Sequence, residues 1–318
     1  MLGQWMEQEI LDQPRILREQ GTGYFETAKQ ALGGKTFEMI LLAARGSSDH
    51  AALFARYLIE IHLKRPVSLA APSVLTRYGV QIQYPATLAI GISQSGSAPD
   101  VAEVLSAMRE AGHGTLAITN TEGSRLTQEA EHSILLGAEK EKSVAATKTY
   151  LTSLLALIQV VRALGADLPD PMATLPTDEW CAVCREAARA AAGQVDRANP
   201  VFALARGYQF STACETALKL MECALLPCKA YSTSDFEHGP KALADRGSAS
   251  IVYEESVDAL AKQGTQVVLA PSVPSEVPMP YRPLWSVIFG QFLALEVARL
   301  REEDPDKPQF IQKVTETF

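Results

Sequence analysis

The sequence lacks a long hydrophobic run, an excess of basic residues and an N-terminal leader pattern. No stretch approaches the roughly 20 apolar residues that a membrane span requires, and Met1 to Gln20 has no basic region followed by an apolar run. The net charge of -8 and the pI near 5.3 leave no basic face for a phosphate backbone. These absences predict a cytoplasmic protein with neither nucleic acid nor a membrane as a partner.

Cysteines are few and odd in number. The five cysteines lie mostly in helical patterns, which suits a reducing cytoplasm rather than a disulfide framework. Cys181 and Cys184 form a CxxC pair, but no second pair and no nearby histidines accompany it. This pair is therefore predicted to pack inside a helix rather than to bind zinc, and no metal or redox cofactor is expected.

The 318 residues are enough for two modest domains, and apolar residues at 47% with charged residues at 21% are typical of a globular protein. Short apolar runs alternate with helical patterns, which predicts parallel sheets covered on both faces: an α/β protein with two doubly wound domains in tandem. The best linker is Gly165 to Asp178, which holds three prolines. The predicted segments are a helical lead-in (1–34), a first sheet domain (35–168), a second sheet domain (179–303) and a C-terminal tail (304–318).

The two predicted domains begin alike. Ala44-Arg45-Gly46 follows the first predicted strand and Ala205-Arg206-Gly207 follows the first strand of the second half, which suggests a duplication. Residues 4 to 33 are expected to form one or two helices, interrupted near Pro14.

Acid, base and amine groups concentrate between Cys214 and Leu243. If Gln209 to Leu225 is helical, Glu215, Lys219 and Glu222 lie at i, i+4 and i+7 on one face. His238 follows in a loop closed by Gly239-Pro240. Such a set can move protons on a small polar substrate. The alternative is a solvated helix whose Glu215–Lys219 pair contributes only a few tenths of a kcal/mol.

Serine-rich segments follow the predicted strands. Ser47-Ser48 and Ser93 to Ser97 fall at strand ends, where hydroxyls and free amides at a helix start can bind an anion. A third cluster, Ser143 to Thr149, follows the charged run Glu139 to Lys142, which is most simply a solvated loop. Neither GxxxxGK(S/T) nor GxGxxG is present, so a compact sugar phosphate fits better than a nucleotide. The alternative is that the serines only cap helices.

Five motifs in order resemble the sugar isomerase (SIS) family. They are Ser93-Gln94-Ser95-Gly96, Val144-Ala145-Ala146-Thr147-Lys148, Glu215 to Lys219 with Glu222, Glu237-His238-Gly239-Pro240, and Lys313-Val314-Thr315. The resemblance covers essentially the whole chain and is nearest to the isomerase half of glucosamine-6-phosphate synthases and to stand-alone SIS-type glucosamine-6-phosphate deaminases. It implies two flavodoxin-like SIS domains, and a homodimer with a sugar-phosphate site shared between domains and subunits.

The resemblance also implies roles by position. Glu222 matches the carboxylate that shuttles a proton between sugar C1 and C2, and His238 matches a ring-opening imidazole supplied by the neighbouring subunit. Lys219 matches an assisting lysine, Lys313 a tail lysine that forms an imine with the open-chain ketose, and Glu215 a carboxylate near the substrate amine. The phosphate-binding and substrate-binding positions are Ser47, Ser48, Ser93, Gln94, Ser95, Ser97, Val144 and Ala145.

Four features depart from the synthase pattern. The glutamine-hydrolysing domain is not expected, because Gly46 comes too early to leave room for it. Ala98 replaces the usual Ser or Thr of the phosphate loop, and Ser97 lies one place earlier. Ser248 to Ala270 is shorter than its counterpart, which predicts a thinner second sheet. The tail reads Gln312-Lys313-Val314 without the usual serine, a form that resembles the deaminase branch.

The sequence therefore predicts an isomerising deaminase that converts glucosamine 6-phosphate to fructose 6-phosphate and ammonia. A fructosamine-6-phosphate deglycase needs the same acid, base and phosphate groups, with a pocket for an amino acid, and a galactosamine-type substrate is also open. A non-catalytic sugar-phosphate sensor is the alternative of another class.

Overall fold

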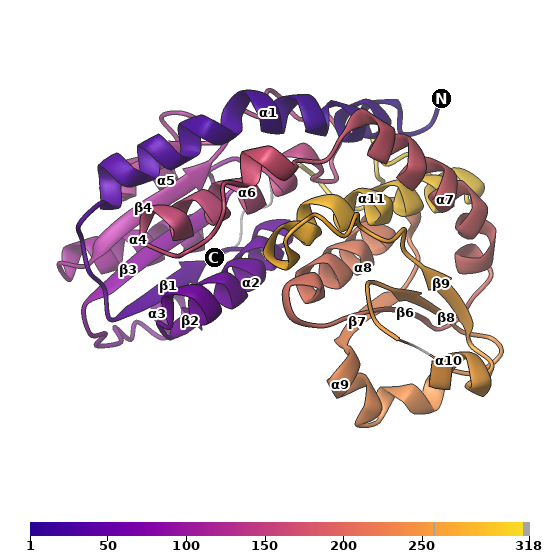
Figure 1. Cartoon of the computed structure of the whole chain (residues 1–318). Coiled ribbons are helices and arrows are strands. Elements are labelled where there is room, and N and C mark those ends of the chain that lie inside the picture. Colours follow the sequence, from indigo (N-terminus) through magenta and orange to yellow (C-terminus); the bar gives the residue numbers. More distant parts are fainter. Residues whose placement is uncertain (257, 314–318) are drawn as a thin grey trace. The chain divides into compact units, whose positions relative to one another are not determined.

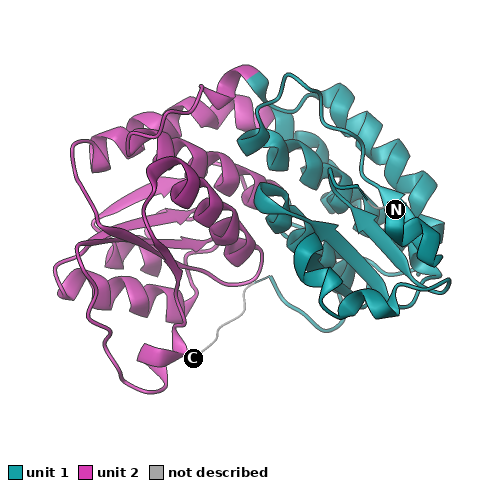
Figure 2. Cartoon of the chain, turned by 60° about the horizontal axis from the view of Figure 1, so that its bottom comes forward, with its two compact units in different colours: residues 1–14, 141–147, 174–313 teal, residues 15–140, 148–173, 314–318 magenta. Residues whose placement is uncertain are grey.

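The computed structural model describes residues 1–256 and 258–313, which fold into two compact units (Figures 1 and 2). Unit 1 contains residues 1–14, 141–147 and 174–313, and unit 2 contains residues 15–140 and 148–173. The chain thus enters unit 1 three times. The four segments predicted from the sequence divide the chain by motif rather than by packing, and their limits stay a prediction.

Unit 2 is built on a five-stranded parallel sheet. Its strands are β1 (Met39–Ala43), β2 (Val67–Leu69), β3 (Thr87–Ser93), β4 (Gly114–Thr119) and β5 (His132–Leu135), in the order β2-β1-β3-β4-β5. All seven residues of β3 are buried. Strands buried on both faces read as continuous apolar runs, which is why they were visible in the sequence.

Helices cover both faces of this sheet (Figure 1). They are α2 (Ser47–Leu58) with a π-helical extension (Ile59–Leu63), α3 (Ser73–Thr76), α4 (Pro99–Glu110), α5 (Arg125–Glu129) and α6 (Lys148–Ala163). Helices α4 and α5 pack on the face that carries Leu41, Ala89 and Ala117. Helix α2 packs against α6.

Unit 1 repeats this topology with one strand fewer. Its parallel sheet consists of β6 (Val201–Ala205), β7 (Cys228–Ser232), β8 (Ala249–Val252) and β9 (Gln266–Leu269), in the order β7-β6-β8-β9. The order matches β2-β1-β3-β4, so the predicted tandem of doubly wound sheets is confirmed, and the second sheet is the thinner one. The segment Ser248 to Ala270 nevertheless supplies two complete strands, β8 and β9. The strand that unit 1 lacks among the described residues is the counterpart of β5, which would follow Leu269.

The long helices of unit 1 pack on one another. They are α7 (Asp178–Asp196), α8 (Phe210–Ala224) and α11 (Arg282–Leu300), and α11 contacts both of the others. The shorter elements are α9 (Thr233–Glu237), α10 (Asp258–Gln263) and 3₁₀ turns at Gly207–Gln209, Pro240–Leu243 and Met279–Tyr281. Cys181 and Cys184 are fully buried on α7, as the packing prediction requires.

The expectation that no segment approaches membrane-spanning length is wrong for one helix. Met279–Leu300 is long and apolar enough by composition, but 83% of its apolar window is buried inside the fold. Its contacts with α7 and α8 account for the apolar composition of this core helix.

The expected break at Pro14 does not occur. Helix α1 (Gln4–Leu32) contains Pro14 in its interior. Proline removes one backbone donor, but buried Ile10, Ile16 and Leu17 on either side keep both halves packed. The boundary between the two units falls directly after Pro14.

The repeated Ala-Arg-Gly segments have the same backbone geometry. Gly46 has φ +55° and Gly207 has φ +59°, each between a central strand and the following helix. Residues that carry a side chain rarely adopt this backbone conformation, so glycine is favoured at both turns. The shared turn and the shared strand order support the duplication inferred from the sequence.

Candidate functional site

The two serine loops of unit 2 lie at the carboxyl ends of adjacent strands. β1 pairs with β3 from Met39↔Thr87 to Ala43↔Gly91. Ser47 and Ser48 are the first residues of α2, and Ser93 ends β3. Neighbouring parallel strands bring these loops to one edge of the sheet, which is where ligands of doubly wound sheets bind.

The second serine loop is ordered by its own hydrogen bonds. The Gly96 amide donates to the Ser93 hydroxyl at 3.2 Å, and the Ser97 amide donates to the Ser95 hydroxyl at 3.2 Å. The Gln94 carbonyl accepts from the Asn120 amide at 3.0 Å. The Ser97 hydroxyl donates to the Ser95 carbonyl at 3.3 Å and is exposed, so it lies on the outside of this turn rather than replacing a hydroxyl at Ala98.

An ion pair that the sequence did not reveal joins the two loops. Arg45 Nε and Nη2 each lie 2.7 Å from Asp100 Oδ2. Asp100 is buried in the first turn of α4, whereas Arg45 is half exposed. Arg45 precedes the first serine pair and Asp100 follows the second cluster, so the contact fixes one loop against the other.

Helix α8 in unit 1 carries the predicted charged face. The side chains of Glu215 and Lys219 are 0% and 1% exposed, and that of Glu222 is 25% exposed. Lys219 Nζ lies 3.4 Å from Glu215 Oε1 and hydrogen bonds to Glu222 Oε2. The predicted face is confirmed as a cluster, and the alternative of a solvated helix surface is wrong.

The cluster keeps its lysine charged. Burial by itself lowers the pKa of Lys219, but the carboxylates of Glu215 and Glu222 outweigh burial and raise that pKa above the ordinary 10.5. Glu222 is the member that reaches solvent. A partly exposed carboxylate held by a buried ammonium has the form of a positioned proton carrier.

His238 follows α9 at the surface of unit 1. Its amide donates to the Asp235 carbonyl at 3.0 Å, and its side chain is exposed. Gly239, with φ +139°, turns the chain immediately afterwards, so glycine is favoured there. No hydrogen bond between His238 and the α8 carboxylates occurs within residues 1–256 and 258–313.

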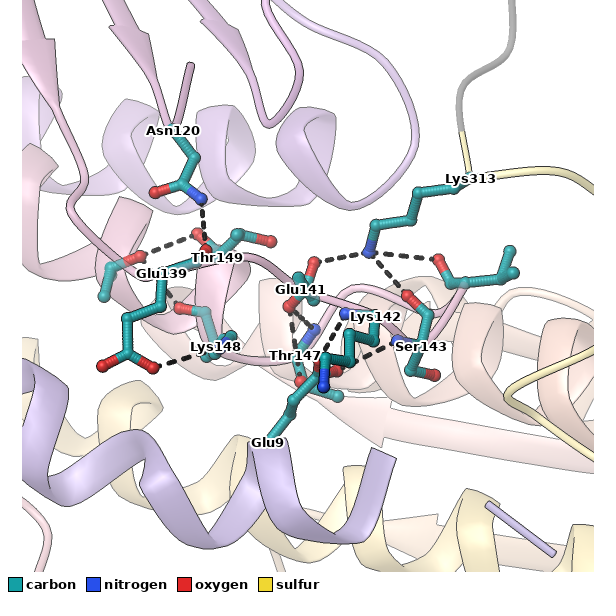
Figure 3. A network of polar contacts seen from close by, with 12 residues as sticks. Glu9, Asn120, Glu139, Glu141, Lys142, Ser143, Thr147, Lys148, Thr149 and Lys313 are labelled. Atoms are coloured by element: carbon teal, nitrogen blue, oxygen red, sulfur yellow. Dashed lines mark hydrogen bonds and ion pairs between the residues drawn. The ribbon is translucent and has the colours of Figure 1, made fainter. Parts of the chain in front are cut away.

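Lys313 is anchored to the loop 141–147 of unit 1. Its Nζ lies 2.6 Å from Glu141 Oε2 and 2.8 Å from the Ser143 carbonyl, and Figure 3 shows the side chain directed at both. The Val144 carbonyl lies 3.5 Å away, and Ala145 beside it is buried. The expectation that Glu139 to Lys142 is a solvated run is therefore wrong for Glu141, whose side chain is 0% exposed.

The third serine and threonine cluster closes on carboxylates rather than presenting an open anion site. Glu141 Oε1 accepts from the Thr147 amide at 2.9 Å, and Glu9 accepts from the amides of Lys142 and Ser143. Its backbone donors at Lys142, Ser143 and Thr147 are thus satisfied within unit 1. Among the residues that the structure describes, no group of three or more His, Cys, Asp or Glu side chains is placed to hold a metal ion.

Comparison with known proteins identifies the first half of the chain. Residues 38–163, which hold all five strands of unit 2, match the SIS domain. The chain contains a SIS domain. The family predicted from the serine, lysine and histidine motifs is therefore confirmed.

Relatives extend the SIS likeness over the whole chain. The glutamine–fructose-6-phosphate aminotransferase (isomerizing) of Methanothermobacter thermautotrophicus is 31% identical over 338 residues, which cover 97% of this chain and 57% of the relative. The chain thus spans less than two thirds of that protein.

Two solved structures show the same fold. The C-terminal domain of glucosamine-fructose-6-phosphate aminotransferase from Francisella tularensis superposes with a TM-score of 0.79 at 22% identity, covering 94% of this chain and 97% of that domain. Glucosamine-6-phosphate deaminase from Thermotoga maritima gives 0.82 at 22% identity, covering 98% and 100%. The prediction of two SIS-type sheets in tandem is confirmed by these superpositions.

Proposed function

We propose that the chain is an isomerising deaminase that converts glucosamine 6-phosphate and water to fructose 6-phosphate and ammonia. The observation that carries the proposal is the α8 cluster, in which two buried charges hold the partly exposed Glu222. A buried ion pair is a poor way to stabilise a helix, because desolvation offsets most of the attraction. A role in chemistry explains why these charges occur inside the unit.

The serine loops supply the proposed phosphate site. The first loop starts α2 with Ser47 and Ser48, and the second contains Ser93, Gln94 and Ser95. Hydroxyls and amides at the carboxyl edge of a parallel sheet suit a phosphate dianion. Arg45 adds a positive charge beside them and is held by Asp100.

The proposed reaction is a proton transfer followed by loss of the amine. His238 of a second copy assists opening of the sugar ring, and Glu222 takes the proton from C2 and returns it to C1, which leaves an imine at C2. Lys313 adds to that carbon as ammonia leaves, and water then releases the ketose. A positioned carboxylate contributes roughly 10² to 10⁴-fold to such steps. The proposal includes a homodimer and a cytoplasmic location, and it needs no redox cofactor.

The test is ammonia release from glucosamine 6-phosphate by the purified protein. Wild type is expected to release ammonia, and Glu222→Gln is expected to lose roughly 10²-fold or more in kcat. Glu186→Gln on the exposed surface of α7 is the matched control and is expected to retain wild-type kcat. Equal kcat for Glu222→Gln and wild type would remove Glu222 from the mechanism.

The same assay separates the other functions. Turnover of fructosamine 6-phosphates with no ammonia from the amino sugar would make the protein a deglycase. Ammonia release from galactosamine 6-phosphate but not from glucosamine 6-phosphate would assign a galacto-configured substrate to the protein. Thermal stabilisation by these phosphates without any turnover would make it a sensor.

A further inference from the structure

We infer that Glu141 is the positioning residue of Lys313: it holds the lysine amine in the 141–147 loop and takes its proton when the amine becomes a nucleophile. The inference rests on the proposed function, in which Lys313 adds to C2 of the substrate. It concerns residues of unit 1 only.

The contacts of Lys313 account for the three protons of an ammonium group. One points at Glu141 Oε2 at 2.6 Å, one at the Ser143 carbonyl at 2.8 Å and one toward the Val144 carbonyl at 3.5 Å (Figure 3). An ammonium whose protons are all donated has no lone pair with which to attack carbon. In this arrangement Lys313 is held in place but is not nucleophilic.

Glu141 is the group suited to change that state. Its side chain is 0% exposed, and that of Lys313 is 24% exposed. Burial disfavours charged groups, so it raises the free energy of the carboxylate–ammonium pair. The neutral pair, protonated Glu141 with the free Lys313 amine, is thereby closer to it in free energy. Proton transfer over a 2.6 Å hydrogen bond moves no heavy atom.

Other charged groups around the loop are already engaged. Glu9 accepts from the backbone amides of Lys142 and Ser143. The Lys142 ammonium lies 3.6 Å from the centre of the Trp5 ring and faces that ring instead of Glu141. Glu141 is thus the carboxylate that hydrogen bonds to Lys313, and Thr147 fixes its other oxygen at 2.9 Å.

The proposed step balances as follows. The Lys313 ammonium gives a proton to the Glu141 carboxylate, and the free amine attacks C2 of the substrate iminium. Ammonia leaves, and a lysine iminium remains with the same single positive charge. Water converts this iminium to the ketose and the Lys313 ammonium, and the proton on Glu141 leaves with ammonia as ammonium ion. The Glu141 carboxylate is thereby regenerated and again faces the Lys313 ammonium.

A double-mutant cycle tests whether Glu141 acts through Lys313. Lys313→Met and Glu141→Gln are each expected to lower kcat about 10²-fold, with little change in KM. If Glu141 acts only through Lys313, the double variant is expected to be no slower than Lys313→Met alone. A further loss of kcat in the double variant, with its melting temperature restored, would overturn the inference.

Stability gives a second readout that needs no substrate. Lys313→Met removes the cation that faces the buried Glu141 carboxylate and is expected to lower the melting temperature, and adding Glu141→Gln is expected to restore part of it. Equal melting temperatures for all four proteins would show that the pair does not form. The matched controls are Glu122→Gln, at an exposed glutamate of unit 2, and Lys307→Met, at an exposed lysine of the same tail. Both controls are expected to behave as wild type.

Trapping the imine separates this inference from the proposed function. Fructose 6-phosphate with borohydride is expected to label Lys313 of wild type, seen by peptide mass, and the yield is expected to fall about tenfold or more in Glu141→Gln. Undiminished labelling of Glu141→Gln would overturn the role of Glu141. Labelling of wild type without ammonia release from glucosamine 6-phosphate would instead reject the deaminase and keep the Glu141–Lys313 assignment.

Discussion

Lys219 shows how much a single buried charge depends on its neighbours. It is 1% exposed and is balanced by Glu215 on one side and Glu222 on the other. Each carboxylate raises the pKa of Lys219 against the opposing effect of burial. Removal of the ammonium would take a buried ion-pair partner away from Glu215 inside the unit.

Lys219→Met is therefore expected to lower the free energy of unfolding by roughly 3 to 5 kcal/mol, because one partner of a buried pair is lost. Urea unfolding at neutral pH measures the change. Adding Glu215→Leu is expected to recover much of the loss, since it removes the buried carboxylate that had faced the ammonium. An unchanged unfolding midpoint for Lys219→Met would contradict the buried ion group.

At the residue scale, periodicity predicted contacts within one helix but not contacts between distant segments. The spacing of Glu215, Lys219 and Glu222 placed them correctly on one face. The pairs Arg45–Asp100 and Glu141–Lys313 were missed, because their members are 55 and 172 residues apart and no local pattern links them. Glu141 was assigned to solvent for the same reason: its charge is neutralised by a residue of the tail.

At the element scale, the repeated turn after β1 and β6 depends on backbone conformation alone. A Cβ at Gly46 or Gly207 would meet no atom within 4 Å, yet both residues have positive φ. Any cost of alanine there is therefore strain in the turn rather than a steric clash.

Gly46→Ala and Gly207→Ala are each expected to destabilise the protein by roughly 1 to 2 kcal/mol. Gly23→Ala is the control, because Gly23 lies inside α1 with ordinary φ and an added Cβ would meet no atom within 4 Å outside the local helix backbone. That control is expected to stabilise by roughly 0.5 to 1 kcal/mol. Chemical unfolding compares the three, and equal effects at all three positions would refute the conformational explanation.

The start of α1 is capped from the other end of the chain. The amides of Trp5 and Met6 donate to the Asp306 carboxylate at 2.7 and 3.0 Å, and the Gly3 amide donates to Asp304 at 2.9 Å. The amides of Trp5 and Met6 are first-turn donors that have no partner within the helix, and a carboxylate at this end also complements the helix dipole.

Asp306→Ala is expected to lower the free energy of unfolding by roughly 0.5 to 2 kcal/mol through loss of this cap. Asp12→Ala is the matched control, because the Asp12 carboxylate accepts only a surface hydrogen bond from Gln8 on the same helix. Thermal unfolding measures both. A larger loss for Asp12→Ala than for Asp306→Ala would contradict the cap.

The elements themselves were largely predictable, because parallel strands are continuous apolar runs and the helices carry clear periodicity. The errors came where packing outweighs local preference. Pro14 remains inside α1, and the apolar residues of α11 face other helices of unit 1. Neither outcome follows from the local sequence, since each is decided by neighbours elsewhere in the chain.

At the scale of the whole molecule, buried thiols and phenols predict an alkaline limit to stability. Burial raises the pKa of Cys223 and of Cys228 from the ordinary 9.0 to about 12, and raises the pKa of Tyr24 and Tyr253 above their ordinary 10.0. Between pH 9 and 12 the unfolded thiols lose protons that the native thiols keep. Stability is therefore complete below pH 9 and falls as pH rises through this window.

The free energy of unfolding is expected to fall by about 1.4 kcal/mol per pH unit for each such group above its unfolded pKa. Urea titrations at pH 8 and pH 10.5 measure the difference. A Cys223→Ala, Cys228→Ala variant is expected to show a shallower fall, because two of the ionising groups are gone. An unfolding free energy that is flat across this range would contradict the burial of these groups.

The three passages of the chain through unit 1 set an order of events during synthesis. Every strand and long helix of unit 2 is complete once residue 173 has been translated. Residues 1–14 belong to unit 1, and their cap at Asp306 is made about 300 residues later. The first helical segment to leave the ribosome therefore acquires its final partners among the last, and its apolar residues remain exposed in the meantime.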